Sequence, residues 1–264
     1  HYGRDLDRDA GLHVLLQRLL EETEIPWFRL LYIYSAGLRP ELVELIAREE
    51  RLLSYIDMPI QHASPRMLES MRRPERPGRL REKIGWLRSE IPDLTLRTTV
   101  VVGFPGETEE DFEALLEFVE EIGFDHLGAF AYSPQKGTRG AELPDPVPEP
   151  VKMERLAIVN DLQRSIVAAK NQERIGRTYE VLVDRRGDNG LEGRTRSQAF
   201  EIDGVTYLEG PRLDLGPGDL ARATVAGADD ADLWATVESK VNVSRRPIPS
   251  DRGAALDLQT AWGR

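Results

Sequence analysis

Strand-like and helix-like segments alternate along the first half of this chain, and this alternation most constrains its fold. Runs rich in aromatic and β-branched residues predict strands at 29–34, 55–58, 94–102 and 126–132. Stretches with helical apolar spacing predict helices at 12–19, 41–48, 65–71, 79–89 and 109–122. Strands that alternate with helices form parallel sheets with right-handed connections. The pattern therefore predicts a parallel α/β fold.

Two local signals refine this prediction. The run 100–102 is apolar throughout, which is typical of a strand covered on both faces. Thr108 stands three residues before Asp111, the spacing of a helix N-cap and its capping-box partner. The start of the fifth helix is therefore well specified.

The pattern changes after residue 132. Prolines at alternate positions from 144 to 150 predict an extended linker at 143–150, followed by a long helix at 152–172. Beyond this helix, about five short strand patterns are separated by turn sequences such as Asp203-Gly204, which predicts a small all-β barrel. We therefore expect one domain at 1–172, a barrel at 173–241 and a loose C-terminal tail at 242–264.

Charge and cysteine content exclude several functions. The chain has 35 Lys and Arg against 46 Asp and Glu, a net charge of −11, which disfavours non-specific nucleic-acid binding and favours a cationic partner. No uncharged run exceeds ten residues, so we expect no membrane-spanning helix, and the start at His1 lacks a signal-peptide pattern. With no cysteine, the chain cannot form disulfides or hold iron–sulfur clusters by its own thiolates. We predict no metal site, because His13 and His126 have no partner at ligand spacing.

Ligands of parallel α/β folds bind at the carboxyl ends of the strands, so the segments that follow the predicted strands are candidate sites. The segment 103–108 contains two glycines and a proline but lacks the Gly-Lys-Ser/Thr ending of a phosphate-binding loop, which argues against nucleotide hydrolysis. Its backbone amides and carbonyls could meet the edge of a ligand. The alternative is a capped strand-to-helix turn without a ligand.

Short polar side chains follow the second predicted strand. Gln61, His62 and Ser64 could hydrogen-bond a ribose or an amino-acid group. Alternatively, Ser64 caps the helix that begins at Pro65, and His62 is a structural histidine.

Three further features allow either a functional or a structural interpretation. Arg97, on an otherwise apolar strand with Thr99, either meets an anion or reaches solvent. Tyr132 either stacks on a planar base or packs in the core. A basic cluster either contacts an acidic or nucleic-acid surface or is solvated; it comprises Arg72, Arg73, Arg76, Arg79 and Arg81. The acidic runs at 107–111 and 120–121 predict solvated helix faces.

Segments 55–64, 103–112 and 132–134, taken in order, resemble the radical S-adenosylmethionine methylthiotransferases. The tRNA-modifying branch usually has Gln-Ser-Gly-Ser where this chain has Gln61-His62-Ala63-Ser64. The form found here resembles the RimO branch, which modifies an aspartate of a small-subunit ribosomal protein. Segments 193–195 and 201–205 resemble the TRAM barrel of that branch.

The resemblance implies an incomplete βα barrel that binds S-adenosylmethionine, with two 4Fe-4S clusters in the full-length family. It places Gln61, His62 and Ser64 near the ribose and the methionine. It also places Arg97 and Thr99 on the inner strand surface, and Gly103, Phe104 and Tyr132 around the adenine. It assigns no catalytic residue.

The family's cluster-binding cysteines are absent, and by the resemblance they would precede His1. We therefore expect this chain to be the C-terminal part of such an enzyme, inactive by itself, monomeric and cytoplasmic, with a ribosomal protein as partner. Two other hypotheses remain: a tRNA adenosine methylthiotransferase, and a non-catalytic module that binds a ribosomal protein or RNA.

Overall fold

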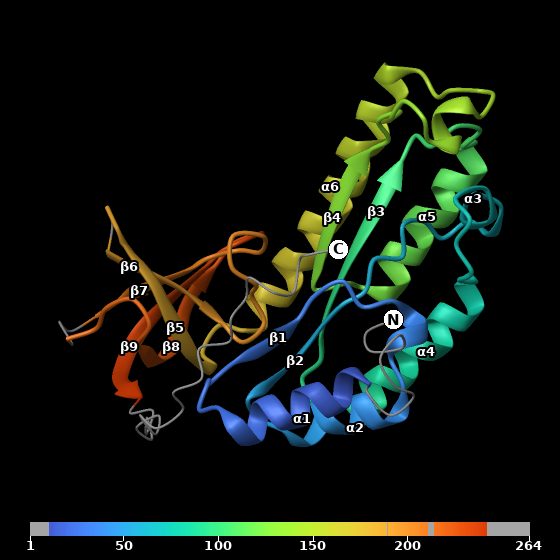
Figure 1. The fold of residues 1–264 in the computed structure, drawn as a ribbon. Coiled ribbons are helices and arrows are strands. Elements are labelled where there is room, and N and C mark those ends of the chain that lie inside the picture. The colour runs from blue at the N-terminus through green and yellow to red at the C-terminus, as the bar shows by residue number, and fades with distance from the viewer. Residues whose placement is uncertain (1–10, 189, 211–213, 242–264) are drawn as a thin grey trace.

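The first part of the chain folds into an open four-stranded sheet. The computed structural model describes residues 11–188, 190–210 and 214–241. Neighbouring strands are parallel and lie in the order β1 (Phe28–Leu30), β2 (Leu52–Asp57), β3 (Thr95–Val102) and β4 (His126–Ala131), as Figure 1 shows. This confirms the predicted parallel α/β sheet.

Helices pack on one face of this sheet. They are α1 (Leu12–Glu22), α2 (Pro40–Arg48), α4 (Pro77–Glu90), α5 (Glu109–Ile122) and α6 (Glu149–Gln172). The short helix α3 (Pro65–Ser70) lies between β2 and α4 in the chain, and 3-10 turns are at Ser35–Gly37 and Arg139–Glu142. Leu96, Val100 and Val102 of β3 share one hydrophobic core with residues of α1, α2, α4, α5 and α6. These alternate side chains hold the helices against the sheet.

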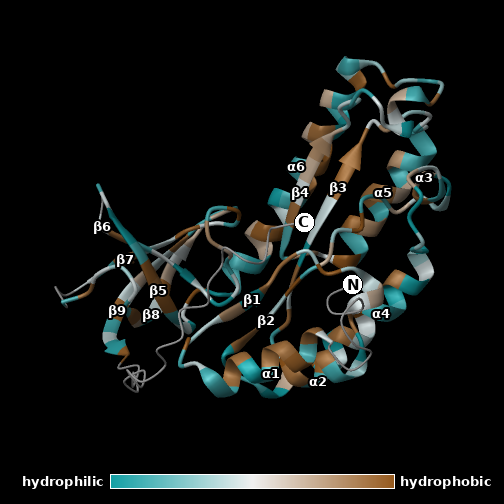
Figure 2. Cartoon of the chain, in the orientation of Figure 1, coloured by the Kyte–Doolittle hydropathy of each residue, from teal (hydrophilic) through white to brown (hydrophobic). Residues whose placement is uncertain are grey.

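The other face of β3 remains accessible. Arg97, Thr99 and Val101 alternate with the buried residues and are only half-buried. The prediction that 100–102 is covered on both faces is therefore wrong for Val101, since the helices pack on one side only. In Figure 2, β3 is pale along its shaft and brown at its arrowhead, its carboxyl end.

Local chemistry sets several element boundaries. The capping box of α5 is formed as predicted, with the Thr108 side chain accepting from the Asp111 amide and the Asp111 side chain accepting from the Thr108 amide. Strand β1 ends earlier than predicted, and Tyr32 just beyond it has a φ of 57°, outside the β region. Helix α6 begins at Glu149, before the predicted start, because Pro150 is tolerated in a first helical turn.

The second part of the chain is a closed five-stranded barrel, which confirms the predicted small β-barrel. Its strands follow the order β5 (Thr178–Gly187), β6 (Gly190–Thr195), β7 (Thr206–Glu209), β9 (Leu233–Val241) and β8 (Leu220–Ala228). Small and β-branched residues fill its interior, among them Val181, Val183, Ala223, Ala235 and Val237. The predicted tail at 242–264 lies outside the described residues. Within the described ranges, no helix is long and apolar enough to cross a membrane.

Candidate functional site

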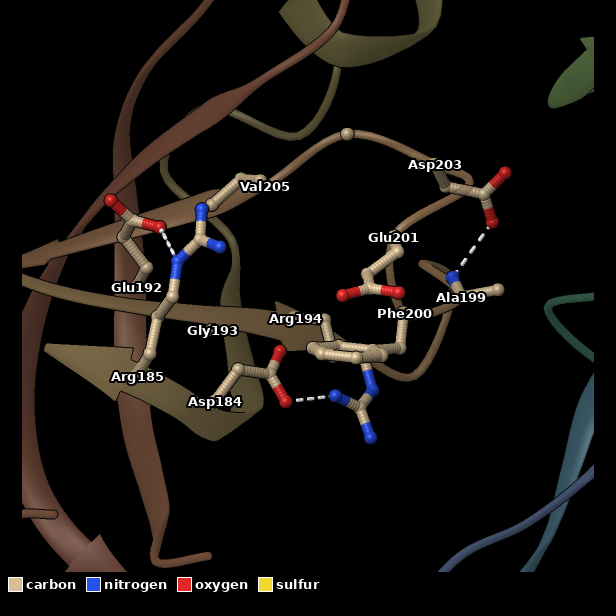
Figure 3. A pocket seen from close by; sticks show the side chains of 11 residues that line it. Asp184, Arg185, Glu192, Gly193, Arg194, Ala199, Phe200, Glu201, Asp203 and Val205 are labelled. Carbon is tan, nitrogen blue, oxygen red and sulfur yellow. Dashed lines mark hydrogen bonds and ion pairs between the residues drawn. The ribbon is translucent and has the colours of Figure 1, made fainter. Parts of the chain in front are cut away.

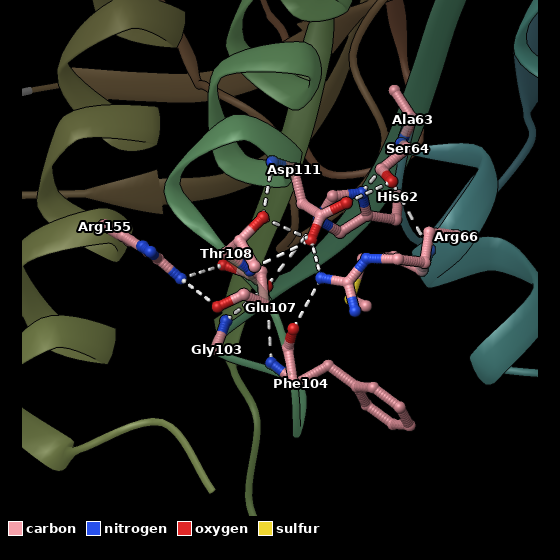
Figure 4. A network of polar contacts seen from close by, with 12 residues as sticks. His62, Ala63, Ser64, Arg66, Gly103, Phe104, Glu107, Thr108, Asp111 and Arg155 are labelled. Atoms are coloured by element: carbon pink, nitrogen blue, oxygen red, sulfur yellow. Dashed lines mark hydrogen bonds and ion pairs between the residues drawn. The ribbon is translucent and has the colours of Figure 1, made fainter. Parts of the chain in front are cut away.

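The turn that follows β3 is held by a buried carboxylate. Glu107 accepts hydrogen bonds from the backbone amides of Gly103 at 2.7 Å and Phe104 at 3.3 Å, and pairs with Arg155 of α6 at 2.8 Å (Figure 4). The left-handed Gly103, with a φ of 73°, lies so close to Lys152 that a Cβ would stand 2.3 Å from its Cγ. The turn is therefore a rigid part of the carboxyl edge of the sheet.

A second buried carboxylate joins this turn to α3. Asp111 accepts from the Ser64 hydroxyl at 2.5 Å, from the Thr108 amide at 2.9 Å and from Arg66. Burial alone would raise the pKa of Asp111, but the hydrogen bonds from Arg66, Ser64 and Thr108 outweigh it and hold the pKa well below its ordinary value. The prediction of a solvated face was therefore wrong for Glu107 and Asp111.

His62 and Ser64 have partners inside the protein. Nδ1 of the fully buried His62 accepts from the amides of Ala63 at 3.0 Å and Ser64 at 2.9 Å, while Nε2 lies 3.6 Å from Glu107. Ser64 caps α3, and its hydroxyl also accepts from the Met67 amide. Both residues therefore brace the two segments that follow β2 and β3.

Replacing Asp111 by asparagine should lower the free energy of unfolding at pH 7 by about 1.5–3 kcal/mol, the range for hydrogen bonds to charged groups. Because the folded pKa is depressed, this contribution is present above the ordinary pKa of 3.8 and is lost as pH falls through lower values. Urea unfolding at several pH values should show the two proteins converging toward pH 2. The exposed Glu113→Gln on the same helix is the control, and a pH-independent gap for Asp111→Asn would contradict the prediction.

A cavity of about 240 Å³ opens between the segments that follow β1 and β2. Its lining consists of Tyr32, Ile33, Tyr34, Pro59, Gln61, Arg73 and Thr99. Gln61 lies beside β3, since its backbone amide donates to the backbone carbonyl of Thr99 at 2.9 Å. Tyr32 and Gln61 have φ values of 57° and 69°, which non-glycine residues rarely adopt and which often mark functional sites. The structure thus brings two predicted site residues, Gln61 and Thr99, to one cavity.

Another group of predicted residues meets at the ends of β3 and β4. The rings of Phe104 and Tyr132 pack edge to face with centroids 4.9 Å apart, and the Tyr132 carbonyl accepts from Lys152 Nζ at 3.1 Å. Within the described ranges the buried Tyr132 hydroxyl has no hydrogen-bond partner. Gly103, Phe104 and Tyr132 therefore form one group, apart from the cavity.

Arg97 is occupied by protein carboxylates. Its guanidinium lies 3.2 Å from Asp57 and 3.4 Å from Asp203, which belongs to the barrel segment between β6 and β7. Burial alone would lower the pKa of Arg97, but Asp57, Tyr55 and Asp203 raise it. The anion that this arginine meets here is thus supplied by the chain itself.

Asp203 connects the barrel with the sheet. It accepts from the Tyr55 hydroxyl and from the Ala199 amide, both at 2.7 Å, and lies 3.5 Å from His126. Figure 3 shows it turned toward Ala199. Sequence reasoning missed this residue, because its Asp-Gly pair signalled only a turn.

Comparisons with known proteins identify both parts of the chain. Residues 3–119 match the family model of the radical SAM superfamily, and residues 175–237 match that of the TRAM domain. The solved structure of coproporphyrinogen III oxidase (HemN) from Escherichia coli, a radical SAM enzyme, aligns with a TM-score of 0.47 and 14% identity over 84% of this chain and 54% of that chain.

Curated relatives named ribosomal protein uS12 methylthiotransferase RimO match almost the whole chain. The protein of Desulforudis audaxviator is 46% identical over 90% of this chain and 53% of its own length, and that of Anaeromyxobacter sp. is 42% identical over 96% and 54%. This chain therefore spans about half the length of the curated relatives it matches. With both domain matches and these identities, the chain belongs to the RimO-type radical S-adenosylmethionine methylthiotransferases that carry a TRAM domain.

Proposed function

We propose that this chain is the cofactor-holding sheet and TRAM barrel of an enzyme that methylthiolates the β-carbon of an aspartate in ribosomal protein uS12. The observation that carries this proposal is the identity of 42–46% to uS12 methylthiotransferases over nine-tenths or so of the chain. The reaction replaces a β-hydrogen of the aspartate by a methylthio group. We place the enzyme in the cytoplasm, with its substrate.

The side chains that line the cavity suit S-adenosylmethionine as a ligand. The side-chain amide of Gln61 and the hydroxyl of Thr99 provide hydrogen bonds for polar groups of the ligand, and the rings of Tyr32 and Tyr34 provide apolar surface. When bound, the cofactor supplies radical chemistry, while the protein binds, orients and shields the reactants. Phe104 and Tyr132, at the ends of β3 and β4, do not line the cavity; we propose that the adenine ring extends beyond the cavity along this edge of the sheet and contacts them.

Iron–sulfur clusters do not fit this chain. Their usual ligands are cysteine thiolates, and none of the 264 residues is cysteine. In the described ranges no group of three or more His, Asp or Glu side chains could hold a metal ion. Our proposal therefore gives this chain the roles of holding cofactor and substrate, and leaves cluster binding to other residues of the enzyme.

The barrel suits a basic protein better than tRNA. Residues 173–240 contain nine Lys and Arg against fourteen Asp and Glu. Three of the four arginines that could form an RNA-binding face are paired with carboxylates: Arg185 with Glu192 at 2.6 Å, Arg194 with Asp184, and Arg196 with Glu180 at 3.2 Å. The fourth, Arg186, donates to the backbone carbonyl of Leu215 at 3.3 Å. Paired guanidiniums offer phosphates little net attraction, so we propose uS12 as the partner.

The activity is tested with a chimera in which this chain replaces the matching part of the Desulforudis audaxviator relative. Anaerobic incubation with S-adenosylmethionine and uS12, followed by mass spectrometry, should show a methylthio group on one aspartate. Titration of the 264-residue chain with uS12 and with tRNA at matched salt should show tighter binding to uS12, weakening as salt rises. Modification of tRNA, or tighter tRNA binding, would replace the proposal by the tRNA alternative.

The Gln61→Ala variant of the chimera should bind S-adenosylmethionine about 1–3 kcal/mol more weakly, the cost of an unsatisfied buried partner. Calorimetry measures this directly, and Gln135→Ala, at an exposed glutamine outside the cavity, is the matched control. Equal affinities for the parent and the Gln61 variant would place Gln61 outside the cofactor site.

A further inference from the structure

We infer that Arg73 binds the side-chain carboxylate of the target aspartate, an inference that rests on the proposed function. Among the described residues that line the cavity, Arg73 is the only charged one. Within the same part of the chain it forms no ion pair, although acidic residues outnumber basic ones by 46 to 35. An unpaired guanidinium beside an otherwise uncharged cavity is a receptor for an anion.

Arg73 is held in place without its charge being neutralised. Its guanidinium lies over the ring of Tyr34, 5.1 Å from the centroid, a cation–π contact that leaves the N–H groups available. The loop that carries Arg73 is also bound to the segment after Tyr34, because the Ser35 hydroxyl donates to the buried Glu75 carboxylate at 3.3 Å. The arginine is thus preorganised against the segment that carries Tyr32 and Tyr34.

The other candidate for an anion receptor is already satisfied. Arg97 has two carboxylate partners, Asp57 and Asp203, and is not among the residues that line the cavity. An incoming carboxylate would have to displace a buried protein carboxylate from Arg97, whereas at Arg73 it would meet an unpaired cation.

The position of Arg73 favours the substrate over the cofactor as the source of the carboxylate. The side chain is half-buried and stands among exposed groups: Tyr32 is 75% exposed, Tyr34 is 52% exposed, and Arg72 and Arg76 are exposed. A protein substrate approaches from this side, while Gln61 and Thr99 line the cavity from the sheet. A guanidinium that grips the aspartate carboxylate also fixes the adjacent β-carbon, which is the atom to be modified.

The inference is tested by a double-mutant cycle in binding, which needs no cluster or turnover. The 264-residue chain and its Arg73→Met variant are titrated with uS12 and with uS12 in which the target aspartate is replaced by asparagine. We expect Arg73→Met to weaken binding of normal uS12 about 10- to 100-fold, and binding of the asparagine form less than about 2-fold. The exposed neighbour Arg72→Met is the control and should affect both forms equally.

Two results would overturn the inference. One is an equal effect of Arg73→Met on both forms of uS12. The other is a loss of S-adenosylmethionine affinity in the chimera with the uS12 cycle unchanged, which would assign the guanidinium to the cofactor carboxylate. If the unaltered chain and chimera neither bind nor modify uS12, the proposed function itself fails, and this outcome is distinct from both.

Discussion

Asp203→Ala should lower the free energy of unfolding by about 3–5 kcal/mol, the range for breaking one side of a buried ion pair. The substitution removes the acceptor of the Tyr55 hydroxyl and of the Ala199 amide, and one of the two carboxylates beside Arg97, whose side chain is 12% exposed. These groups are closed off from water, since Tyr55 is completely buried and the Asp203 side chain is 1% exposed. Urea unfolding, followed by tryptophan fluorescence and circular dichroism, measures the loss.

Two further variants separate the contributions. Asp203→Asn keeps an acceptor for the Tyr55 hydroxyl and should lose less stability than the alanine variant. Asp230→Ala removes an exposed aspartate of the same barrel and should change the free energy by less than about 0.5 kcal/mol. If Asp203→Ala were no more destabilising than Asp230→Ala, the contact between barrel and sheet would not contribute to stability.

The fold was predictable because its signals are local. Alternating strand and helix patterns specify the parallel sheet, and Thr108 with Asp111 specifies the start of α5 within four residues of sequence. Turn sequences such as Asp203-Gly204 separate the barrel strands. The prediction that Val101 is covered was wrong, because an apolar run does not reveal whether helices pack on one face of a strand or on both.

The site was only partly predictable because its contacts join distant residues. Gln61 and Thr99 do meet in one cavity. Arg73 lines the same cavity, but in the sequence it was only part of a basic cluster that was interpreted as solvated or as contacting an acidic or nucleic-acid surface. Asp203 reaches Tyr55 across 148 positions of sequence, a pairing that no local pattern signals. Glu107 has the sequence context of a solvated helix start, and only the folded turn over it makes it a buried acceptor.

These long-range contacts link the barrel to the cavity. Asp203 meets Arg97, Arg97 meets Asp57, and Asp57 accepts from the amide of Tyr32 at 3.0 Å. Tyr32 in turn lines the cavity. Three consecutive polar contacts therefore connect the barrel to Tyr32 in the cavity lining. For this reason the Asp203 variants should be assayed for S-adenosylmethionine binding as well as for stability.

Glu107→Ala should also lower the free energy of unfolding by about 3–5 kcal/mol. It leaves the buried amides of Gly103 and Phe104 without their acceptor and removes the buried carboxylate that pairs with Arg155 at 2.8 Å. Because the same carboxylate holds the turn beside Phe104 and Tyr132, the variant should also weaken S-adenosylmethionine binding in the chimera. Glu107→Gln keeps one acceptor oxygen and should fall between the parent and the alanine variant.

The matched control uses the other carboxylate on Arg155. Glu109 pairs with the same guanidinium at 3.0 Å, but its side chain is 70% exposed, so Glu109→Ala should cost no more than about 1 kcal/mol. Urea unfolding of both variants at pH 7 isolates the effect of burial, because the arginine is common to the two pairs. Equal losses would show that the pairing itself, rather than the closed turn over Glu107, stabilises this edge of the sheet.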